Sequence, residues 1–304
     1  MASRIRYARL ATERANPRSR ALDLLRPREI AALMNREDRR AVLAVGRVRA
    51  EIAAAVSMIV DALESGGRLF FVGAGTSGRL GVLEAAECPP TFGTRPQLVQ
   101  AIMAGGRGAV FRSREGAEDD ERAARRVVRA RVRCGDVVVG ISASGVTPFA
   151  RAALAAARKR GARTVLISCN ATRPGKAFAD VRIVPATGPE VLAGSTRLKA
   201  GTATKLVLNT LTTAVMTGLG RVYGNRMVDL QPRSAKLRER ALRLIAEVAG
   251  VSRGSALQAF EASGRRVRVA IVIARNGWEA AEASRALRAA GGSLRVVLQK
   301  FRRK

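Results

Sequence analysis

The chain has 304 residues, an apolar fraction of 47% and a formal net charge of +31. Length and composition allow a large core, and the sequence shows neither a run of about 18 uninterrupted apolar residues nor a secretory-signal pattern. We therefore expect a globular protein of the cytoplasm with no membrane segment. The chain contains no histidine, which excludes Ser-His-Asp and Cys-His nucleophiles and histidine-ligated metals within it. Acid–base chemistry must use Asp, Glu, Lys, Tyr or Cys.

The positive charge favours phosphorylated ligands or other acidic partners through long-range attraction. Most of the excess is arginine scattered through alanine-rich segments, the aromatic content is 4%, and there is no zinc-finger spacing. Nucleic acid is therefore not the expected partner. The three cysteines, Cys88, Cys134 and Cys169, lack the paired spacing of a metal site or disulfide framework, so we expect reduced, buried thiols.

The N-terminal 66 residues are expected to pack on a core rather than to form one. Residues 1–20 are polar and basic, and Pro17 discourages a continuous helix, so they predict an arm that packs elsewhere or stays mobile. Between residues 27 and 66 apolar side chains recur at helical spacing, which predicts two helices ahead of the first strand.

Residues 67–230 alternate short apolar runs with helical patterns. Such alternation predicts an α/β fold in which a doubly wound, five-stranded parallel sheet carries helices on both faces and binds ligands at the carboxyl ends of its strands. The strands are predicted at 69–72, 98–103, 136–141, 164–168 and 181–184. The helix after the first strand is predicted to end at Pro89-Pro90, and the helix after the second strand to cover 115–129. The helix after the third strand is predicted to end at Arg160, and a long helix after the fifth strand to cover 202–219.

Residues 231–304 predict a small, separate helical domain, similar to a UBA domain. Residues 224–232 mark the boundary before it. Alanine-rich amphipathic patterns predict helices at 234–249, 253–262 and 277–289. The run 266–275 is β-branched enough to form a strand, and we assign it to a helix from its neighbours alone.

A small-residue turn, Gly73-Ala74-Gly75-Thr76-Ser77-Gly78, follows the first predicted strand. Glycines let backbone N–H groups approach a ligand closely, Thr76 and Ser77 add hydroxyl donors, and the helix N-terminus adds about half a positive charge. Residues 142–147 repeat this design after the third strand. Together the two turns predict a phosphate site.

The first turn also matches G-x-G-x-x-G, the fingerprint of dinucleotide binding. The next strand, however, ends in Ala104-Gly105-Gly106, where a nicotinamide-binding unit places an acidic residue. The turn also lacks the Gly-Lys-Ser/Thr ending of a triphosphate P-loop. A small phosphate ester is therefore favoured over a dinucleotide and over a turn with a structural role only.

Two carboxylates stand out by their position. Glu87 lies at the far end of the helix that the small-residue turn begins, and Glu118 follows the second strand in EGAEDD, the expected start of a helix. Both are expected over the carboxyl ends of the strands, where one carboxylate can act as a base and another as an acid. Glu84 and Glu115 lie one turn earlier in each case, and spacing alone does not separate them from Glu87 and Glu118.

Several longer motifs resemble one family. The stretches VGAGTSGRLGVLEAAECPPTFG, EGAEDD, DVVVGISASG, GPEVLAGSTRLKAGTATKLVLN and YGNRMVD together resemble the N-acetylmuramic acid 6-phosphate etherase family, whose core is a sugar isomerase (SIS) domain. The resemblance runs from TERANP at Thr12 to the helical tail. The family also resembles the glucokinase regulatory protein, a non-catalytic sugar-phosphate sensor.

The resemblance implies a reaction without a metal or organic cofactor. The lactyl ether at C3 of N-acetylmuramic acid 6-phosphate is cleaved by elimination and hydration, giving N-acetylglucosamine 6-phosphate and D-lactate in cell-wall recycling. Glu118 would remove the C2 proton, while protonated Glu87 helps lactate to leave and later activates water. The resemblance assigns substrate binding to the two turns and to a further wall, that is to Gly75, Thr76, Ser77, Gly78, Ser142, Ser144, Gly145, Thr147, Glu190, Ser195, Thr196 and Lys199.

Three points of this assignment stay open. Val146 stands where the ASGRTP form of the motif has a polar or basic residue, which removes a side-chain phosphate contact. Glu190 and Lys199 also fit a purely structural ion pair. A homodimer is implied because SIS domains commonly pair and share pocket residues. A regulator that binds sugar phosphate without turnover, or a sugar-phosphate isomerase, are alternative functions, although the presence of both Glu87 and Glu118 favours the etherase.

Overall fold

The computed structural model describes residues 10–170, 179–232 and 234–300. Its contacts divide the chain into two compact units, one made of Met1–Ala86 and Gln97–Thr212 and the other of Glu87–Pro96 and Thr213–Lys304. Two of the three breaks fall inside long helices, α3 (Gly75–Phe92) and α7 (Lys199–Gly218), and the third lies in the turn between Pro96 and Gln97. The predicted division into 1–66, 67–230 and 231–304 stays a prediction.

The first unit is built on a parallel sheet of five strands in the order β2-β1-β3-β4-β5, which confirms the predicted doubly wound α/β fold. The strands are β1 (Leu69–Gly73), β2 (Val99–Met103), β3 (Val137–Ile141), β4 (Arg163–Ile167) and β5 (Val181–Ile183). Gly73 pairs with Met103 on one side and with Ile141 on the other, so three neighbouring strands end in one row.

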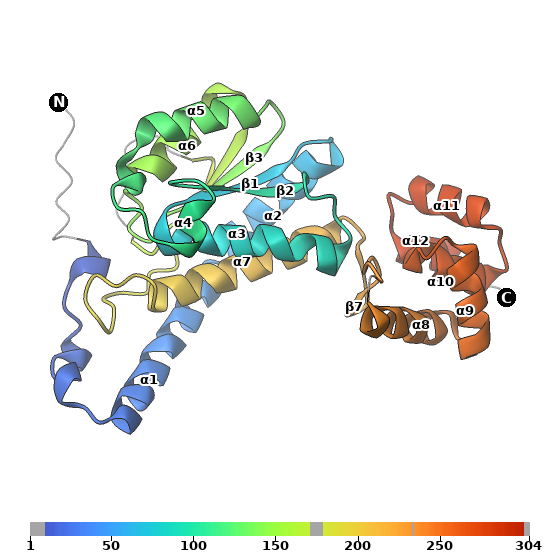
Figure 1. Ribbon diagram of the computed structural model, residues 1–304, viewed down its shortest axis with the longest axis horizontal. Coiled ribbons are helices and arrows are strands. Elements are labelled where there is room, and N and C mark those ends of the chain that lie inside the picture. The colour runs from blue at the N-terminus through green and yellow to red at the C-terminus, as the bar shows by residue number, and fades with distance from the viewer. Residues whose placement is uncertain (1–9, 171–178, 233, 301–304) are drawn as a thin grey trace. The chain divides into compact units, whose positions relative to one another are not determined.

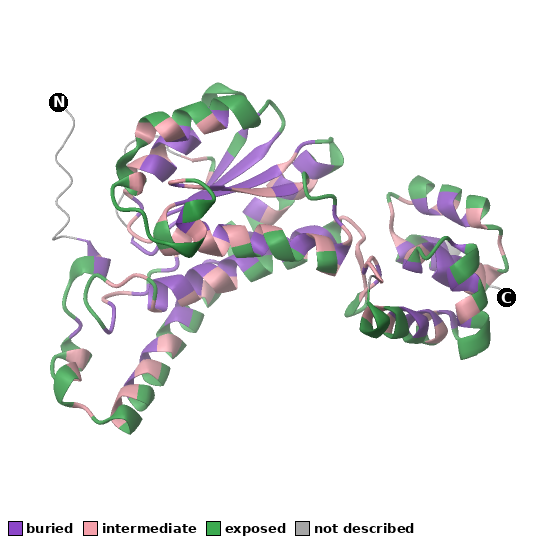
Figure 2. Cartoon of the chain, viewed as in Figure 1, coloured by how far each residue is buried: buried purple, intermediate pink, exposed green. Residues whose placement is uncertain are grey.

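Helices cover both faces of this sheet (Figure 1). On one face, α5 (Glu121–Arg131) and α6 (Pro148–Lys159) bury Phe70 and Val72 in an apolar cluster. Phe71 points to the other face, where a Cβ added to Gly81 of α3 would lie 2.8 Å from the Cβ of Phe71. Because β1 is buried on both sides (Figure 2), its sequence is apolar throughout rather than alternating.

The two predicted helices before the sheet are present as α1 (Pro27–Gly46) and α2 (Arg49–Glu64). Of the predicted arm, residues 1–9 lie outside the described residues. From Leu10 onward the arm forms short 3-10 turns at Ala11–Glu13, Pro17–Ser19 and Leu22–Leu24. Leu10, Thr12 and Asn16 are buried, so this part of the arm packs against the rest of its unit.

Two expected helix boundaries, the end of α3 and the start of α5, are wrong. Pro89 and Pro90 do not stop α3, which runs on to Phe92. The carbonyl groups that their missing N–H donors would have bonded belong to the part-exposed Ala85 and the exposed Ala86, where water can replace the lost bonds. The last turn is closed by Gly93, whose N–H donates to the carbonyl of Pro89 at 3.0 Å.

EGAEDD does not open a helix either. Gly116 adopts φ 71°, and Ala117–Asp119 form a single 3-10 turn. Helix α5 begins only at Glu121, because the side chain of Asp120 accepts the N–H of Ala123 at 2.8 Å and caps the helix there. The short helix α4 (Gly108–Phe111) before this segment was not predicted.

The second unit contains a helical bundle with an apolar core of its own. Its elements are β6 (Val222–Tyr223), β7 (Arg226–Met227), α8 (Ala235–Ala249), α9 (Arg253–Ala262), α10 (Val267–Asn276), α11 (Ala280–Ala289) and α12 (Leu294–Lys300). The β-branched run is helix α10, as assigned, because neighbouring helices surround it and bury Val269, Ile271 and Val272. The β6–β7 ribbon and α12 were not predicted.

Cys88 and Cys169 are buried and form no disulfide, as expected, and burial raises the pKa of the Cys169 thiol to about 12. Cys134 is exposed, which contradicts the expectation for it. Within the described residues, no helix is both long and apolar enough to cross a membrane.

Candidate functional site

The first predicted phosphate turn is the N-terminus of α3. Strand β1 ends at Gly73, and α3 begins two residues later at Gly75, which adopts φ 54°. The first backbone N–H groups of a helix have no partner within it, so they are available to an anion. The hydroxyl groups of Thr76 and Ser77 likewise have no hydrogen-bond partner within the described chain. Gly78 is required here, because an added Cβ would lie 2.5 Å from the backbone carbonyl oxygen of Gly73.

The second turn, which follows β3, is held by its own hydroxyl groups. Ser142 Oγ lies 2.8 Å from Thr147 Oγ1 and accepts the N–H of Gly145 at 3.0 Å. Ser144 Oγ accepts the N–H of Val146 at 3.2 Å. The turn therefore has a defined shape before any ligand binds, and Val146 contributes no polar side chain to it.

The two turns leave the sheet from the same row, because Gly73 and Ile141 are paired neighbours. The start of α7 approaches the first turn as well. A Cβ placed on Gly201 would lie 3.6 Å from the carbonyl oxygen of Thr196 and 3.8 Å from Cγ2 of Thr76. Three predicted binding segments thus meet at the carboxyl ends of the strands, where ligands bind to open α/β sheets.

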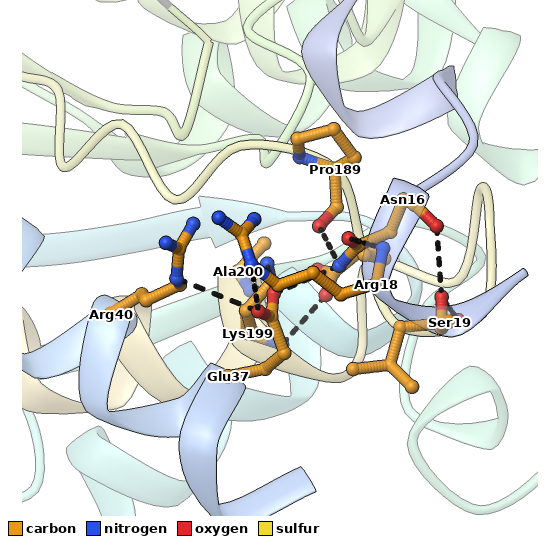
Figure 3. Close-up of polar contacts among 10 residues, drawn as sticks. Asn16, Arg18, Ser19, Glu37, Arg40, Pro189, Lys199 and Ala200 are labelled. Carbon is orange, nitrogen blue, oxygen red and sulfur yellow. Dashed lines mark hydrogen bonds and ion pairs between the residues drawn. The ribbon is translucent and has the colours of Figure 1, made fainter. Parts of the chain in front are cut away.

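The predicted wall residues Glu190 and Lys199 are both buried, and they do not form the ion pair that was the alternative to a binding role. The carboxylate of Glu190 accepts the backbone N–H groups of Lys199 and Ala200, each at 2.9 Å, and so caps the first turn of α7. The Nζ of Lys199 pairs instead with Glu37 of α1 at 2.5 Å, and both of these side chains are 1% exposed (Figure 3). The buried ion pair is therefore Lys199–Glu37.

The pKa values of the two buried carboxyl groups, Glu37 and Glu190, are shifted in opposite directions. Burial would raise the pKa of Glu37, but the hydrogen bonds from Lys199 and Asn16 outweigh it and hold this pKa below its ordinary value of 4.5. Burial raises the pKa of Glu190, because the N–H groups of Ala200 and Lys199 compensate its charge only partly. Both groups act within the framework of the site rather than on its surface.

The N-terminal arm forms hydrogen bonds to Glu37 and to the loop that precedes α7. Asn16 Nδ2 donates to Glu37 Oε2 at 2.8 Å and to the carbonyl of Pro189 at 3.3 Å (Figure 3). Thr12 accepts the N–H of Gly194 on its carbonyl at 3.1 Å, next to the part-exposed Ser195. The arm thereby fixes the loop that carries Ser195 and Thr196.

A second part of the arm holds the second turn. Asn170 Nδ2 donates to Thr12 Oγ1 at 3.1 Å and to the carbonyl of Ala143 at 3.2 Å. Asn170 Oδ1 accepts the N–H of Ala11 at 2.8 Å. A single side chain after β4 therefore connects the arm to the loop of Ser142 and Ser144.

A cavity of about 280 Å³ lies at the carboxyl ends of β1 and β2. Gly75 of the first turn lines it together with Glu115 and Glu118. Arg79 of α3 fixes its rim, since its guanidinium donates to the carbonyls of Val110 at 2.8 Å and Ala109 at 3.0 Å. Glu118 thus lies in one cavity with the first predicted phosphate turn. Glu115, the alternative candidate for the catalytic base, lines the same cavity.

Glu87 does not line this cavity. It is exposed on α3 and belongs to the second compact unit. Its competitor Glu84 is buried, pairs with Lys205 at 2.7 Å and accepts a hydrogen bond from Thr212. Glu84 is therefore a structural residue, which leaves Glu87 as the exposed carboxylate of α3.

Sequence reasoning gave no role to several residues that build the site, namely Thr12, Asn16, Glu37, Arg79 and Asn170. The signal that could have found Thr12 and Asn16 is the motif TERANP, which places two hydrogen-bonding side chains on a segment with no strong helical pattern. No group of three or more His, Cys, Asp or Glu side chains that could hold a metal ion occurs in the described part of the chain.

The doubly wound parallel sheet, with two hydroxyl-bearing turns at its carboxyl edge, coincides with a SIS domain identified by family models. The model of the glucokinase regulatory protein N-terminal SIS domain matches residues 51–158, and the SIS domain model matches residues 117–214. The chain belongs to the N-acetylmuramic acid 6-phosphate etherase family.

Full-length relatives establish this membership. The chain is 50% identical over 293 residues to the N-acetylmuramic acid 6-phosphate etherase of Microcystis aeruginosa, covering 96% of each chain. It is 50% identical over 295 residues to that of Gloeobacter violaceus, covering 97% of this chain and 96% of the relative. Among solved structures, a phosphoheptose isomerase from Francisella tularensis aligns with a TM-score of 0.48 at 18% identity, covering 65% of this chain and 98% of that one.

Proposed function

We propose that the protein is a carbon–oxygen lyase that cleaves the C3 lactyl ether of N-acetylmuramic acid 6-phosphate. The products are N-acetylglucosamine 6-phosphate and D-lactate. The observation that carries this proposal is the cavity in which Glu118 meets the start of α3, because it sets a free carboxylate beside a phosphate-binding helix end. The etherase names of full-length relatives support the choice of substrate.

The phosphate of the substrate is bound between the two turns. Thr76 and Ser77 donate hydroxyl and backbone groups from α3, and Ser142, Ser144 and Thr147 surround it from the second turn. Thr196 and Ser195 line the neighbouring wall. This anchor leaves the sugar carbons to extend toward Glu118.

The reaction requires a base and an acid. In the open-chain form of the sugar, the aldehyde at C1 makes the C2 proton acidic. The carboxylate of Glu118 takes that proton, a double bond forms between C2 and C3, and the C3–O bond breaks. Protonated Glu87 gives its proton to the departing lactate oxygen. Water, deprotonated by Glu87, then adds to C3, and Glu118 returns a proton to C2.

The homodimer is part of this proposal. Glu87 is exposed and absent from the cavity of Glu118, and a second copy of the chain gives one route by which both carboxylates reach the same substrate. The cytoplasmic location expected from the sequence also belongs here as a prediction.

The decisive experiment incubates the protein with N-acetylmuramic acid 6-phosphate in deuterated water and measures D-lactate and the label at C2. We expect one lactate per sugar cleaved and one deuterium at C2 of the product. Substrate binding without lactate release identifies a regulator instead, and a rearranged sugar that keeps its lactyl group identifies an isomerase.

A further inference from the structure

We propose that the second compact unit carries a separate binding site for a small organic phosphate. A cavity of about 790 Å³ opens in this unit. It is lined by segments before β6 and after β7 and by α10, α11 and the turn that follows α11. None of the residues assigned to the proposed reaction lines it, so the site is distinct from the substrate site.

The lining of this cavity is strongly basic. It holds one carboxylate, Asp229, and the five guanidinium groups of Arg221, Arg265, Arg266, Arg268 and Arg288. Asp229 is already engaged, since Arg221 Nη1 donates to it at 3.0 Å and Arg268 pairs with its other oxygen. Arg265 pairs at 3.2 Å with Glu261, which lies outside the lining. Arg266 and Arg288 form no ion pair within the described chain, and this remaining positive charge favours an anion.

Two of the arginines are held rigidly before any ligand binds. Arg221 Nη1 also donates to the carbonyl of Phe92 at 3.1 Å, and Arg268 Nη1 donates to the carbonyl of Gly292 at 2.5 Å. Glycine at 93 permits this packing, because an added Cβ would lie 2.4 Å from the carbonyl oxygen of Asp229. The side chains around the anion are therefore preorganised.

Arg221 also retains an unused donor. Its Nε is buried and has no hydrogen-bond partner within the described chain. A buried donor without a partner is unfavourable, so a rearrangement that gave this Nε an acceptor on ligand binding would favour the bound state. At the rim, Arg288 is exposed and has no ion pair or hydrogen bond in the described chain. Arg288 is therefore available to a ligand at the surface of the cavity.

The size and chemistry of the cavity select the class of ligand. Its volume is within the usual range of small-molecule sites, about 300–1,000 Å³, and far exceeds a bare phosphate ion. Leu230, Val267 and Leu287 supply an apolar wall for an organic body. A phosphate dianion offsets more of the excess charge than a carboxylate does and accepts hydrogen bonds from several guanidinium groups at once.

The test uses the full chain and hydrogen exchange with glucose 6-phosphate as the probe. We expect protection of the amides at 265–269 and 288–292, read out separately from any protection at the α3 start. Arg288→Gln is expected to raise the concentration needed for half-protection of these segments about 10-fold. Arg285→Gln is the matched control, because Arg285 is exposed on the same helix but does not line the cavity, and it is expected to leave that concentration unchanged.

Three results would overturn the proposal. One is the absence of protection in the second unit at saturating probe. Another is an equal loss of affinity in Arg285→Gln and Arg288→Gln, which would indicate diffuse charge attraction rather than a site. The last is equal protection by glucuronate, which carries a carboxylate on the same kind of ring and would refute the assignment to phosphate.

Discussion

Two acidic regions of the first unit are alike in residue type and opposite in environment. Glu37 of α1 and Glu190, which both bind the start of α7, are buried; Glu37 pairs with a lysine and Glu190 accepts backbone N–H groups. Glu115 and Glu118, after β2, are exposed and form no hydrogen bond or ion pair within the described chain. A buried carboxylate must be compensated by the fold, whereas an exposed one can meet a substrate. Substitutions in the first region should therefore change stability, and those in the second should change turnover.

The largest expected effect is on catalysis by Glu118. We expect Glu118→Gln to lower kcat about 1,000-fold, because the amide cannot take the C2 proton, while the thermal unfolding midpoint stays unchanged. D-lactate kinetics and thermal unfolding measure the two quantities. Glu115→Gln is the control from the same cavity and should keep most of the activity. If Glu115→Gln loses as much activity as Glu118→Gln, the assignment of the base is wrong.

The next effect is on stability and concerns Lys199. Lys199→Met should lower the free energy of unfolding by about 3 kcal/mol, because Glu37 stays buried with the neutral donor Asn16 and with only the more distant, half-exposed Arg40 and Arg18 as cations. Denaturant unfolding measures this change. The double variant Glu37→Gln, Lys199→Met removes both charges and should lose less than the sum of the single variants. Additive losses would show that the two side chains do not interact as described.

A smaller effect, on substrate affinity, is expected for the hydroxyl group of Ser77 in the first turn. Ser77→Ala removes a hydroxyl that has no partner in the protein, so it should raise KM about 10-fold and leave stability unchanged. Ser144→Ala is the comparison from the second turn, where the Ser144 hydroxyl accepts the N–H of Val146. It should affect stability as well as KM. A fall in kcat with unchanged KM in Ser77→Ala would contradict a role in phosphate binding.

The smallest expected effect is a pH dependence of stability that arises from Glu37. Its pKa is lower in the folded state than the ordinary value of 4.5, so its contribution is complete above about pH 4.5 and is lost as the pH falls through the folded-state pKa. Burial raises the pKa of Glu190, so its contribution to the pH dependence of stability has the opposite sign. Glu37→Gln should therefore lose stability less steeply than the parent protein below pH 4.5. Parallel curves in acid unfolding would contradict this contribution.

Much of the fold could be predicted from local pattern. Five apolar runs gave five strands, because a strand that helices bury on both faces leaves little room for polar residues. The ends of helices were harder to predict. The continuation of α3 through Pro89 and Pro90 depends on whether water reaches the unpaired carbonyl groups, and the delayed start of α5 depends on the backbone conformation of Gly116.

The candidate site divides in the same way. The two turns were evident from composition, because small and hydroxyl-bearing residues after an apolar strand have few other uses. The partner of Lys199 could not be predicted, because Glu37 lies 162 residues away and spacing in sequence carries no information about that contact. The same holds for Asn170, which connects the arm to the second turn across 158 residues.

The sequence by itself determined the class of fold, the two hydroxyl-bearing turns after β1 and β3 and, through long motifs, the family. These depend on local chemistry: apolar periodicity, glycine geometry and hydroxyl donors. Tertiary structure alone decided which acids are structural and which are exposed, because burial and compensation of a charge arise from residues far apart in the chain. It placed Glu84 and Glu37 in ion pairs, left Glu118 unpaired in a cavity, and brought five arginines and Asp229 to the lining of another cavity.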